Sequence, residues 1–320
     1  MEIQLLLENL TNPALLFFVL GMFSVYVRSD LEIPRNSSKF ISLYLLFSIG
    51  FKGGQALSHE AISADVLWLI LFGLLISTTI PLYVFLISKK RFGTFNAGAL
   101  AAAYGSVSAV TFVTAVSFLE VKQIPFHGYM VAIMALMESP SIIVGLLLVS
   151  LCSEASDHRM SHKKAIHHAL TNGSVLLILG SLFIGYLVTD KEAEGIKPFT
   201  NDLFKGFLAI FLLDLGIMTG KKLLSLFRYG WSPLVLAIII PLVNGCTIAI
   251  LSGYLTDDIS NRFLFAILAA GASYIAVPAA VKIALPEANP GLFIPMALGI
   301  TFPVNITIGM PLYFYLVETF

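Results

Sequence analysis

The sequence predicts an all-α membrane protein with ten transmembrane helices, arranged as two inverted repeats of five. Three observations predict this fold: an apolar composition, ten hydrophobic segments, and motifs of the first half that return in the second. Hydrophobic residues make up 58% of the 320-residue chain and charged residues only 12%, whereas soluble domains have about 25% charged residues. Most of the surface must therefore face lipid, where helices satisfy the backbone polar groups that an open strand would leave unpaired.

Ten hydrophobic segments are each long enough to cross a bilayer as a helix. They cover residues 12–28, 38–57, 62–88, 96–119, 124–152, 170–189, 199–222, 231–255, 261–284 and 290–317. The first is preceded by MEIQLLLENLTNP, which has two glutamates and no basic region. We therefore expect the first helix to be retained rather than removed as a signal peptide.

Basic residues mark every second connection between these segments. The connections after helices 1, 3, 5 and 7 contain Arg28, Arg35, Lys39, Lys89, Lys90, Arg91, Arg159, Lys163, Lys164, Lys221, Lys222 and Arg228. The alternate connections have fewer: Lys52, Lys122, Arg262 and an acid-diluted stretch at 190–205. Cytoplasmic loops are enriched in lysine and arginine, so this pattern predicts that both termini lie outside.

Motifs of the first five helices recur in the last five. LLFSIGFKGGQAL (45–57) resembles FLLDLGIMTGKKL (211–223), and MESPSIIVG (137–145) resembles ITFPVNITIG (300–309). The repeats are expected at 1–153 and 170–320, joined by a cytoplasmic connection at 154–169. Because five is odd, the second copy must enter from the opposite face, as in many secondary transporters.

Helices 4 and 9 have small and hydroxyl residues where an ordinary membrane helix is apolar. AAYGSVSAVTFV (102–113) aligns with LAAGASYIAVPA (268–279), so that Gly105 falls on Gly271. Glycine and serine weaken a helix, and Pro278 removes a backbone donor. We expect both helices to break and present free N–H groups to a small anion and free carbonyls to sodium. The alternative is that small residues serve close helix packing.

Two acidic residues fall within the spans, Glu138 and Asp214. Glu138 precedes Pro140, which frees backbone groups, and a carboxylate beside serines and loose carbonyls suits a hard cation. The alternative is a glutamate that extends to water. Asp214 could form a polar contact between helices or pair with Lys52. Asn305, opposite Glu138 in the repeat, could complete a polar lining or hydrogen-bond between helices.

Other function classes have little support. The net charge is zero and no long basic tract is present, which disfavours nucleic acid. Cys152 and Cys246 form no disulfide framework. The histidines within 153–170 could bind zinc, but a solvated loop fits better. No nucleophile triad, phosphate loop or HExxH motif indicates an enzyme, and no cofactor is expected.

Four stretches resemble the sodium-dependent bicarbonate transporter family best known from cyanobacteria. They read GFKGGQAL, FGTFNAGALAAAYGSVSAVTFVTAV, ALMESPSIIV and LPEANPGLFIPMALGITFPVNITIGMPLYF. The resemblance implies an elevator transporter in the cell inner membrane, in which a core of helices 3–5 and 8–10 slides against a scaffold of helices 1, 2, 6 and 7. It also implies a homotrimer and, in the cyanobacterial members, a PII-like cytoplasmic regulator.

The resemblance also implies a site where helices 4 and 9 cross. Its substrate residues are Gly105, Ser106, Val107, Ser108, Gly271, Ala272, Ser273 and Tyr274. The family's helix-5 acid falls on Glu138. From the residues themselves we add Ser139, Thr111 and Asn305 as candidate sodium ligands, and Pro140, Pro278, Pro303 and Asp214 as further candidate positions. The family has Ser-Ser-Ser-Asp where this chain reads GASY (271–274), so Tyr274 replaces an acid.

The expected function is sodium-coupled import of a small anion, bicarbonate. Sodium- or proton-coupled carriage of a small organic acid is the alternative that Tyr274 keeps open. A non-transporting membrane sensor is a third possibility, and it would bind ligand without flux.

Overall fold

The computed structural model describes residues 13–59, 64–152, 173–226, 229–274 and 276–320. These residues form helices and connecting segments, with no strand among them. In seven places the helical structure is long and apolar enough to cross a membrane, and three further apolar helices are shorter. Large apolar side chains are exposed on α2 and α4, among them Phe23, Trp68 and Leu75, as lipid contact requires.

The described residues of the first half form six helices. They are α2 (Pro13–Tyr26), α3 (Arg35–Ser58), α4 (Ala64–Phe92), α5 (Thr94–Gly105), α6 (Ala109–Val121) and α7 (Tyr129–Cys152). The expected fourth segment is thus two helices, α5 and α6, on either side of a short extended stretch.

The second half follows the same order with more irregular turns. It contains α9 (Gly173–Leu187), α10 (Asp190–Ala193), η1 (Pro198–Asp202), α11 (Phe204–Leu226), α12 (Ser232–Leu251), η3 (Ser252–Tyr254), α13 (Ile259–Ala270), α14 (Ala276–Ala284), α15 (Pro290–Met296), η4 (Ala297–Thr301), α16 (Phe302–Val304), η5 (Asn305–Gly309) and α17 (Met310–Thr319). The expected ninth segment is again two helices, α13 and α14.

The last apolar segment is continuous but contains two π-helical stretches, η4 and η5. Pro303 follows η4 within α16, and Pro311 follows η5 within α17. A proline has no N–H and its ring clashes with the preceding turn, and a wider turn relieves both problems. Pro303 therefore reshapes this segment without interrupting it.

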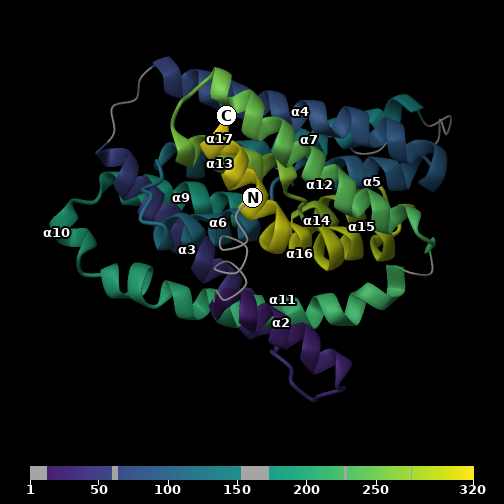
Figure 1. Cartoon of the computed structure of the whole chain (residues 1–320), viewed down its shortest axis with the longest axis horizontal. Helices are drawn as coiled ribbons and strands as arrows, with labels where there is room; N and C mark the ends of the chain where they lie inside the picture. The colour runs from purple at the N-terminus through teal and green to yellow at the C-terminus, as the bar shows by residue number, and fades with distance from the viewer. Residues whose placement is uncertain (1–12, 60–63, 153–172, 227–228, 275) are drawn as a thin grey trace.

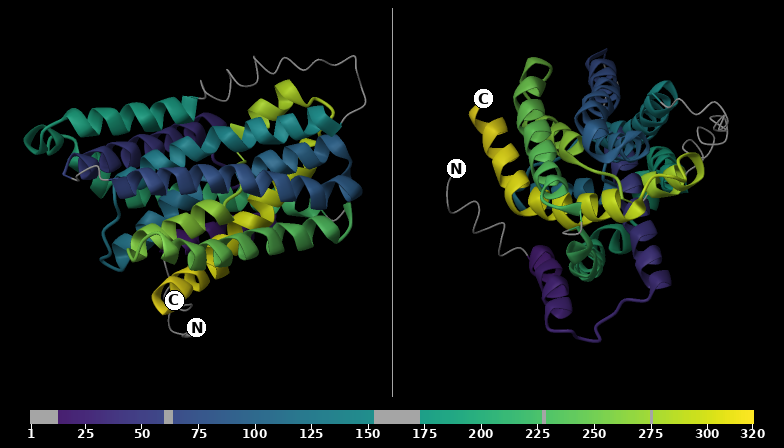
Figure 2. Two further views of the ribbon diagram at one scale, coloured as in Figure 1. Left: turned by 90° about the horizontal axis from the view of Figure 1, so that it is seen from above. Right: turned by 90° about the vertical axis from the view of Figure 1, so that its right-hand side faces the viewer.

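Most of the long helices run along a common direction (Figures 1 and 2). Two helix pairs have extensive contacts: α2 packs on α11, and α3 packs on α9. These four helices occupy the positions of the expected scaffold, and we call them the scaffold helices. The core helices are α4 to α7 and α12 to α17. Among them, α5, α6 and α13 have largely buried side chains, and the other core helices pack around these three.

Glycines bring the scaffold pairs into backbone contact. A Cβ added to Gly21 would collide with the backbone of α11 at Gly216, and one added to Gly54 would collide with the backbone of α9 at Gly185. Small residues allow this close approach, which supplies van der Waals contact where lipid gives little hydrophobic driving force. The two crossings are alike in atomic detail: each added Cβ meets a carbonyl oxygen, an amide nitrogen and a glycine Cα of the facing helix.

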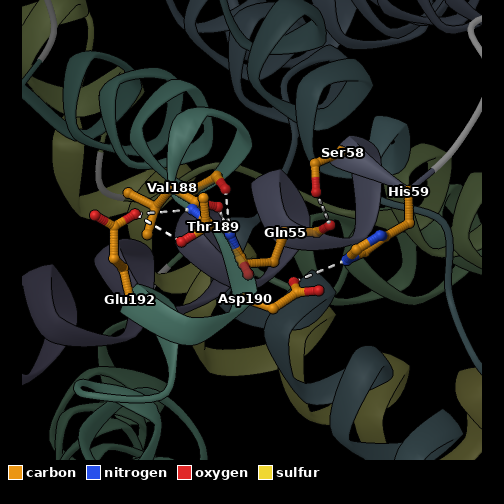
Figure 3. A network of polar contacts seen from close by, with 8 residues as sticks. Gln55, Ser58, His59, Val188, Thr189, Asp190 and Glu192 are labelled. Atoms are coloured by element: carbon orange, nitrogen blue, oxygen red, sulfur yellow. Dashed lines mark hydrogen bonds and ion pairs between the residues drawn. The ribbon is translucent and has the colours of Figure 1, made fainter.

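Polar side chains fasten one end of the α3–α9 pair (Figure 3). The Gln55 amide donates to the carbonyls of Gly185 and Val188, and His59 lies 3.0 Å from the Asp190 carboxylate. Beyond them, Thr189 and Glu192 form a capping box at the start of α10. Hydrogen bonds from the Thr189 hydroxyl and amide lower the pKa of Glu192. The contacts of Gln55 and His59 therefore join α3 to the end of α9 and the start of α10.

Candidate functional site

Two helix breaks lie side by side in the core. α5 ends at Gly105, after which Ser106 turns extended, with φ −82° and ψ 160°. α13 ends at Ala270, after which Gly271 takes nearly the same conformation, with φ −64° and ψ 163°. The backbone N–H of Ser273 donates to the carbonyl of Ala103 over 2.8 Å, so the two breaks touch. The broken helices expected from the glycine and serine pattern are therefore present.

The position of Pro278 differs from the expectation. α13 ends well before the proline, and Pro278 is the third residue of α14. In the first turn of a helix an N–H has no intrahelical acceptor, so proline is tolerated there. Pro278 thus helps α14 to begin, whereas the interruption comes from the Gly-Ala-Ser sequence before it.

A small cavity of about 20 Å³ lies between the two breaks. Its lining residues are Leu46, Val107, Ser108, Ala109, Val110, Glu138, Ser174, Ser273 and Tyr274. Five of the expected site residues are therefore brought together, four from the substrate set and Glu138 from the sodium set. A space of roughly 10–15 Å³ holds one water, so the cavity must widen before it admits a four-atom anion.

Glu138 places a carboxyl group at this cavity from α7. The residue is buried, and its carboxylate has no hydrogen bond or ion pair with any residue that the structure describes. Its backbone carbonyl accepts hydrogen bonds from Ser106 and Ser141, each 3.3 Å long. A carboxylate without a partner in a low-dielectric interior is costly. Glu138 is therefore well suited to bind a cation or a proton.

The first turn of α6 faces the same cavity. Ser108 caps this helix by accepting from the backbone N–H of Thr111 at 3.3 Å and from the Thr111 hydroxyl at 2.8 Å. The cap fixes where the helix starts, and the positive end of its dipole then favours a negative ligand. The Thr111 hydroxyl donates to Ser108, which leaves its oxygen as an acceptor.

Tyr274 adds a hydrogen-bond donor to the cavity. Its ring packs edge-on against Phe302, with centroids 6.2 Å apart. Its hydroxyl is buried near the Ser108 side chain, but it forms no hydrogen bond of good geometry with a described residue. Burying an unpaired hydroxyl costs free energy. A ligand that accepts a hydrogen bond from this hydroxyl would remove that cost.

Gly105, Gly271 and Ala272 do not line the cavity, although all three are buried beside it. A Cβ on Gly105 would lie 2.9 Å from the Cβ of Ser141. One on Gly271 would lie 3.0 Å from the backbone nitrogen of Ser108. Gly105 therefore permits the close approach of α4, where the added Cβ would collide with the ring of Pro81, and of α7, whereas Gly271 permits the close approach of the two breaks.

Asn305 also lies away from the cavity lining. Its amide donates to the carbonyl of Ala270 over 2.7 Å, and its oxygen accepts from the Tyr313 hydroxyl over 3.0 Å. Asn244 donates in the same way to the carbonyl of Ala269 over 3.1 Å. These two amides satisfy the last carbonyls of α13, which the break would otherwise leave unpaired.

The remaining expected residues sit around the site. Ser139 and Pro140 follow Glu138 within α7 and do not line the cavity. Asp214 accepts a hydrogen bond from the Ser38 hydroxyl, which joins α11 to α3. Of the two interpretations of Asp214, the structure supports the contact between helices, because Lys52 pairs with Glu120 instead.

Four lining residues were not expected from the sequence. Ala109 and Val110 follow Ser108 in the first turn of α6, and the other two are Leu46 on α3 and Ser174 on α9. The latter two belong to scaffold helices, so the scaffold contributes to the cavity lining together with the breaks. Neither lies near a break or an intramembrane charge, so only the packing of α3 and α9 against the core identifies them.

Comparison with known proteins agrees with the resemblance. No curated protein matches the chain. A family model described as the Na⁺-dependent bicarbonate transporter superfamily matches residues 13–318, a range that includes both breaks, Glu138 and all the described helices except the last residue of α17. The chain belongs to the Na⁺-dependent bicarbonate transporter superfamily and is a multi-pass membrane protein.

Proposed function

We propose that the protein imports bicarbonate, coupled to sodium, through the cavity between the two helix breaks. One observation carries the proposal: in a member of a bicarbonate transporter superfamily, one small cavity at the breaks holds the Glu138 carboxylate and the Tyr274 hydroxyl, neither of which forms a hydrogen bond of good geometry with a described residue. We assign the anion to the α6 N-terminus, Ser108, Ser273 and Tyr274. We assign sodium to the neighbourhood of Glu138, with Ser139 and Thr111 as candidate further ligands.

Sodium coupling follows from the charges. Moving one anion into a negative cell costs about 2.3 kcal/mol per 100 mV, and one sodium ion cancels that cost. The Glu138 carboxylate would repel an anion in the empty cavity. A bound cation removes the repulsion, so sodium should raise the affinity for the anion, and the anion should raise the affinity for sodium by the same factor.

We further propose ten transmembrane helices in two inverted repeats. The two glycine crossings support this, because α2 on α11 and α9 on α3 are the pairs that a two-fold relation between the halves would exchange. A second pair of contacts is related in the same way. Asn261 of α13 donates to the hydroxyl of Tyr129, the first residue of α7. Asn96 of α5 accepts from the backbone of Asn289, in the connection after α14.

An elevator movement of the core helices against the scaffold helices fits the cavity. The breaks lie in the core, whereas Leu46 and Ser174 line the same cavity from the scaffold. A core that slides past these two residues would uncover the site on one side of the membrane and then on the other.

The test is uptake of labelled bicarbonate into proteoliposomes that contain the purified protein, at fixed pH. An inward sodium gradient should drive accumulation above equilibrium, and an inward potassium gradient should not. Flux without accumulation would indicate a passive channel. Sodium-dependent binding without flux would indicate a sensor. Either result contradicts the proposal.

A small organic acid is the second candidate, favoured by the Tyr274 hydroxyl beside an aromatic ring. That hydroxyl can donate to a carboxylate while the ring contacts carbon. Competition of labelled bicarbonate uptake by acetate and by pyruvate distinguishes the two candidates. Strong competition by either acid would favour the second.

The homotrimer, the inner-membrane location, the external termini and the PII-like regulator stay predictions from the resemblance and the charge pattern. The expected cytoplasmic connection at 154–169, with the histidines considered as zinc ligands, lies outside the described residues.

A further inference from the structure

One ion pair crosses the boundary between the scaffold and the core. The ammonium nitrogen of Lys52, on α3, lies 2.7 Å from the Glu120 carboxylate, at the end of α6. Both side chains are mostly buried. Separating two such charges without giving each a new partner is costly, so this contact resists relative movement of α3 and α6.

Lys52 is held on the scaffold side independently of Glu120. Its ammonium nitrogen lies 4.9 Å from the ring centroid of Phe204, a fully buried residue at the start of α11. A cation over an aromatic face is attracted by the ring quadrupole. If α6 moves away, Lys52 therefore stays with the scaffold, and the bond to Glu120 is the one that breaks.

The other ion pairs among the described residues stay within one group. His59 and Asp190 join two scaffold elements, and Glu194 with Lys197 lies within the connection between α9 and α11. His127 and Asp258 join two connections of the core. Lys52 and Glu120 thus form a cross-boundary ion pair unlike the rest.

A pocket of about 440 Å³ adjoins Lys52. The scaffold supplies most of its wall: Phe51, Lys52, Gln55, Asp190, Ala193, Glu194, Lys197, Thr200 and Asn201. The core supplies Phe126, in the connection after α6. By the charge pattern this is the outer side. The pocket leaves room for the end of α6 and Phe126 to move outward past Lys52.

We propose that Lys52 and Glu120 are positioning residues for transport, which hold the core at the level seen in this structure and separate in each cycle. The inference rests on the proposed movement of core against scaffold. It assigns no cargo, because neither side chain lines the cavity between the breaks.

The test follows the position of the core with a reporter cysteine. Phe126→Cys is introduced with Cys152→Ser and Cys246→Ser, and its labelling by an impermeant maleimide added outside is timed in proteoliposomes. Lys52→Met and Glu120→Gln should each change the labelling rate by about threefold or more, in the same direction, since both shift the balance between core positions. The exchanged pair, K52E with E120K, should return the rate to that of the parent.

Lys122→Met is the matched control. This lysine is two residues beyond Glu120, and its ammonium lies over the rings of Phe118 and Phe314, both in the core. Lys122 has the same charge as Lys52 and lies near Glu120, but its contacts stay within the core. Its replacement should therefore leave the labelling rate unchanged.

Unchanged rates in both single variants would overturn the proposal. So would altered rates that the exchanged pair fails to restore, since these would reflect local packing. Bicarbonate uptake is measured on the same proteins. Its absence in the parent would defeat the proposed function, whereas the labelling result needs no cargo and would still decide the role of the ion pair.

Discussion

Replacing Tyr274 with phenylalanine should stabilise the protein while weakening transport. The hydroxyl is buried and forms no hydrogen bond of good geometry with a described residue. A buried polar group without a partner costs about 1–3 kcal/mol, which the substitution removes without changing the ring. For a chain of this size we expect the melting temperature to rise by roughly 2–6 °C.

Transport should respond in the opposite sense. If the hydroxyl donates to the anion, its loss removes a hydrogen bond to a charged group, worth about 1.5–3 kcal/mol. That corresponds to a roughly 10- to 150-fold higher KM for bicarbonate. Binding without sodium should remain weak in both proteins, because the repulsion from Glu138 is unchanged.

The assay pairs thermal melting of the purified protein with uptake at varied bicarbonate. Tyr313→Phe serves as the control, because the Tyr313 hydroxyl lies 3.0 Å from both the Pro241 carbonyl and the Asn305 oxygen. That variant should melt at a lower temperature. A lower melting temperature for Tyr274→Phe would show that its hydroxyl has a partner in the resting protein. An unchanged KM would refute its contact with the anion.

Three further changes test other parts of the structure. Glu138→Gln keeps the shape of the side chain but removes its charge, so sodium-dependent uptake should fall by about tenfold or more with little change in the melting temperature. Wild-type sodium dependence in this variant would exclude Glu138 as a sodium ligand. Gly216→Val should lower the melting temperature strongly because the added carbons meet the backbone of α2, whereas Gly180→Val, with nothing within 4 Å of its Cβ, should not; equal melting of the two would contradict the close crossing. Asn305→Leu leaves the Ala270 carbonyl unpaired and should cost about 1–3 kcal/mol of stability, measured as a lower melting temperature. If uptake lost its sodium dependence while the melting temperature stayed unchanged, Asn305 would be a sodium ligand instead.

The sequence was most informative where local chemistry decides the structure. The breaks at Ser106 and Gly271 follow from small and hydroxyl residues that weaken a helix wherever they occur. Pro278 does not mark the second break, because the first turn of a helix accepts a proline. Glu138 could be selected because a carboxylate within an apolar segment is unusual in any fold.

Contacts between distant segments could not be predicted from the sequence. The charge pattern places Lys52 among the connection residues, yet the structure pairs it with Glu120, 68 positions away. Leu46 and Ser174 look like ordinary residues of apolar helices until α3 and α9 are packed against the core. Asn305 has the right chemistry for sodium, but the end of α13 engages its amide. Each of these outcomes depends on which helices become neighbours, and one sequence does not determine that.

Because of the hydrogen bond from Ser273 to Ala103, a single substitution in one half of the chain can affect the other half. Ser273 lines the cavity, yet the carbonyl that orients its peptide belongs to α5, in the other half. A change in α5 that moves Ala103 would therefore alter the ligand contacts of Ser273 without touching it. The effects of substitutions in the two breaks should be non-additive, and natural variation in one break should restrict which residues the other can accept.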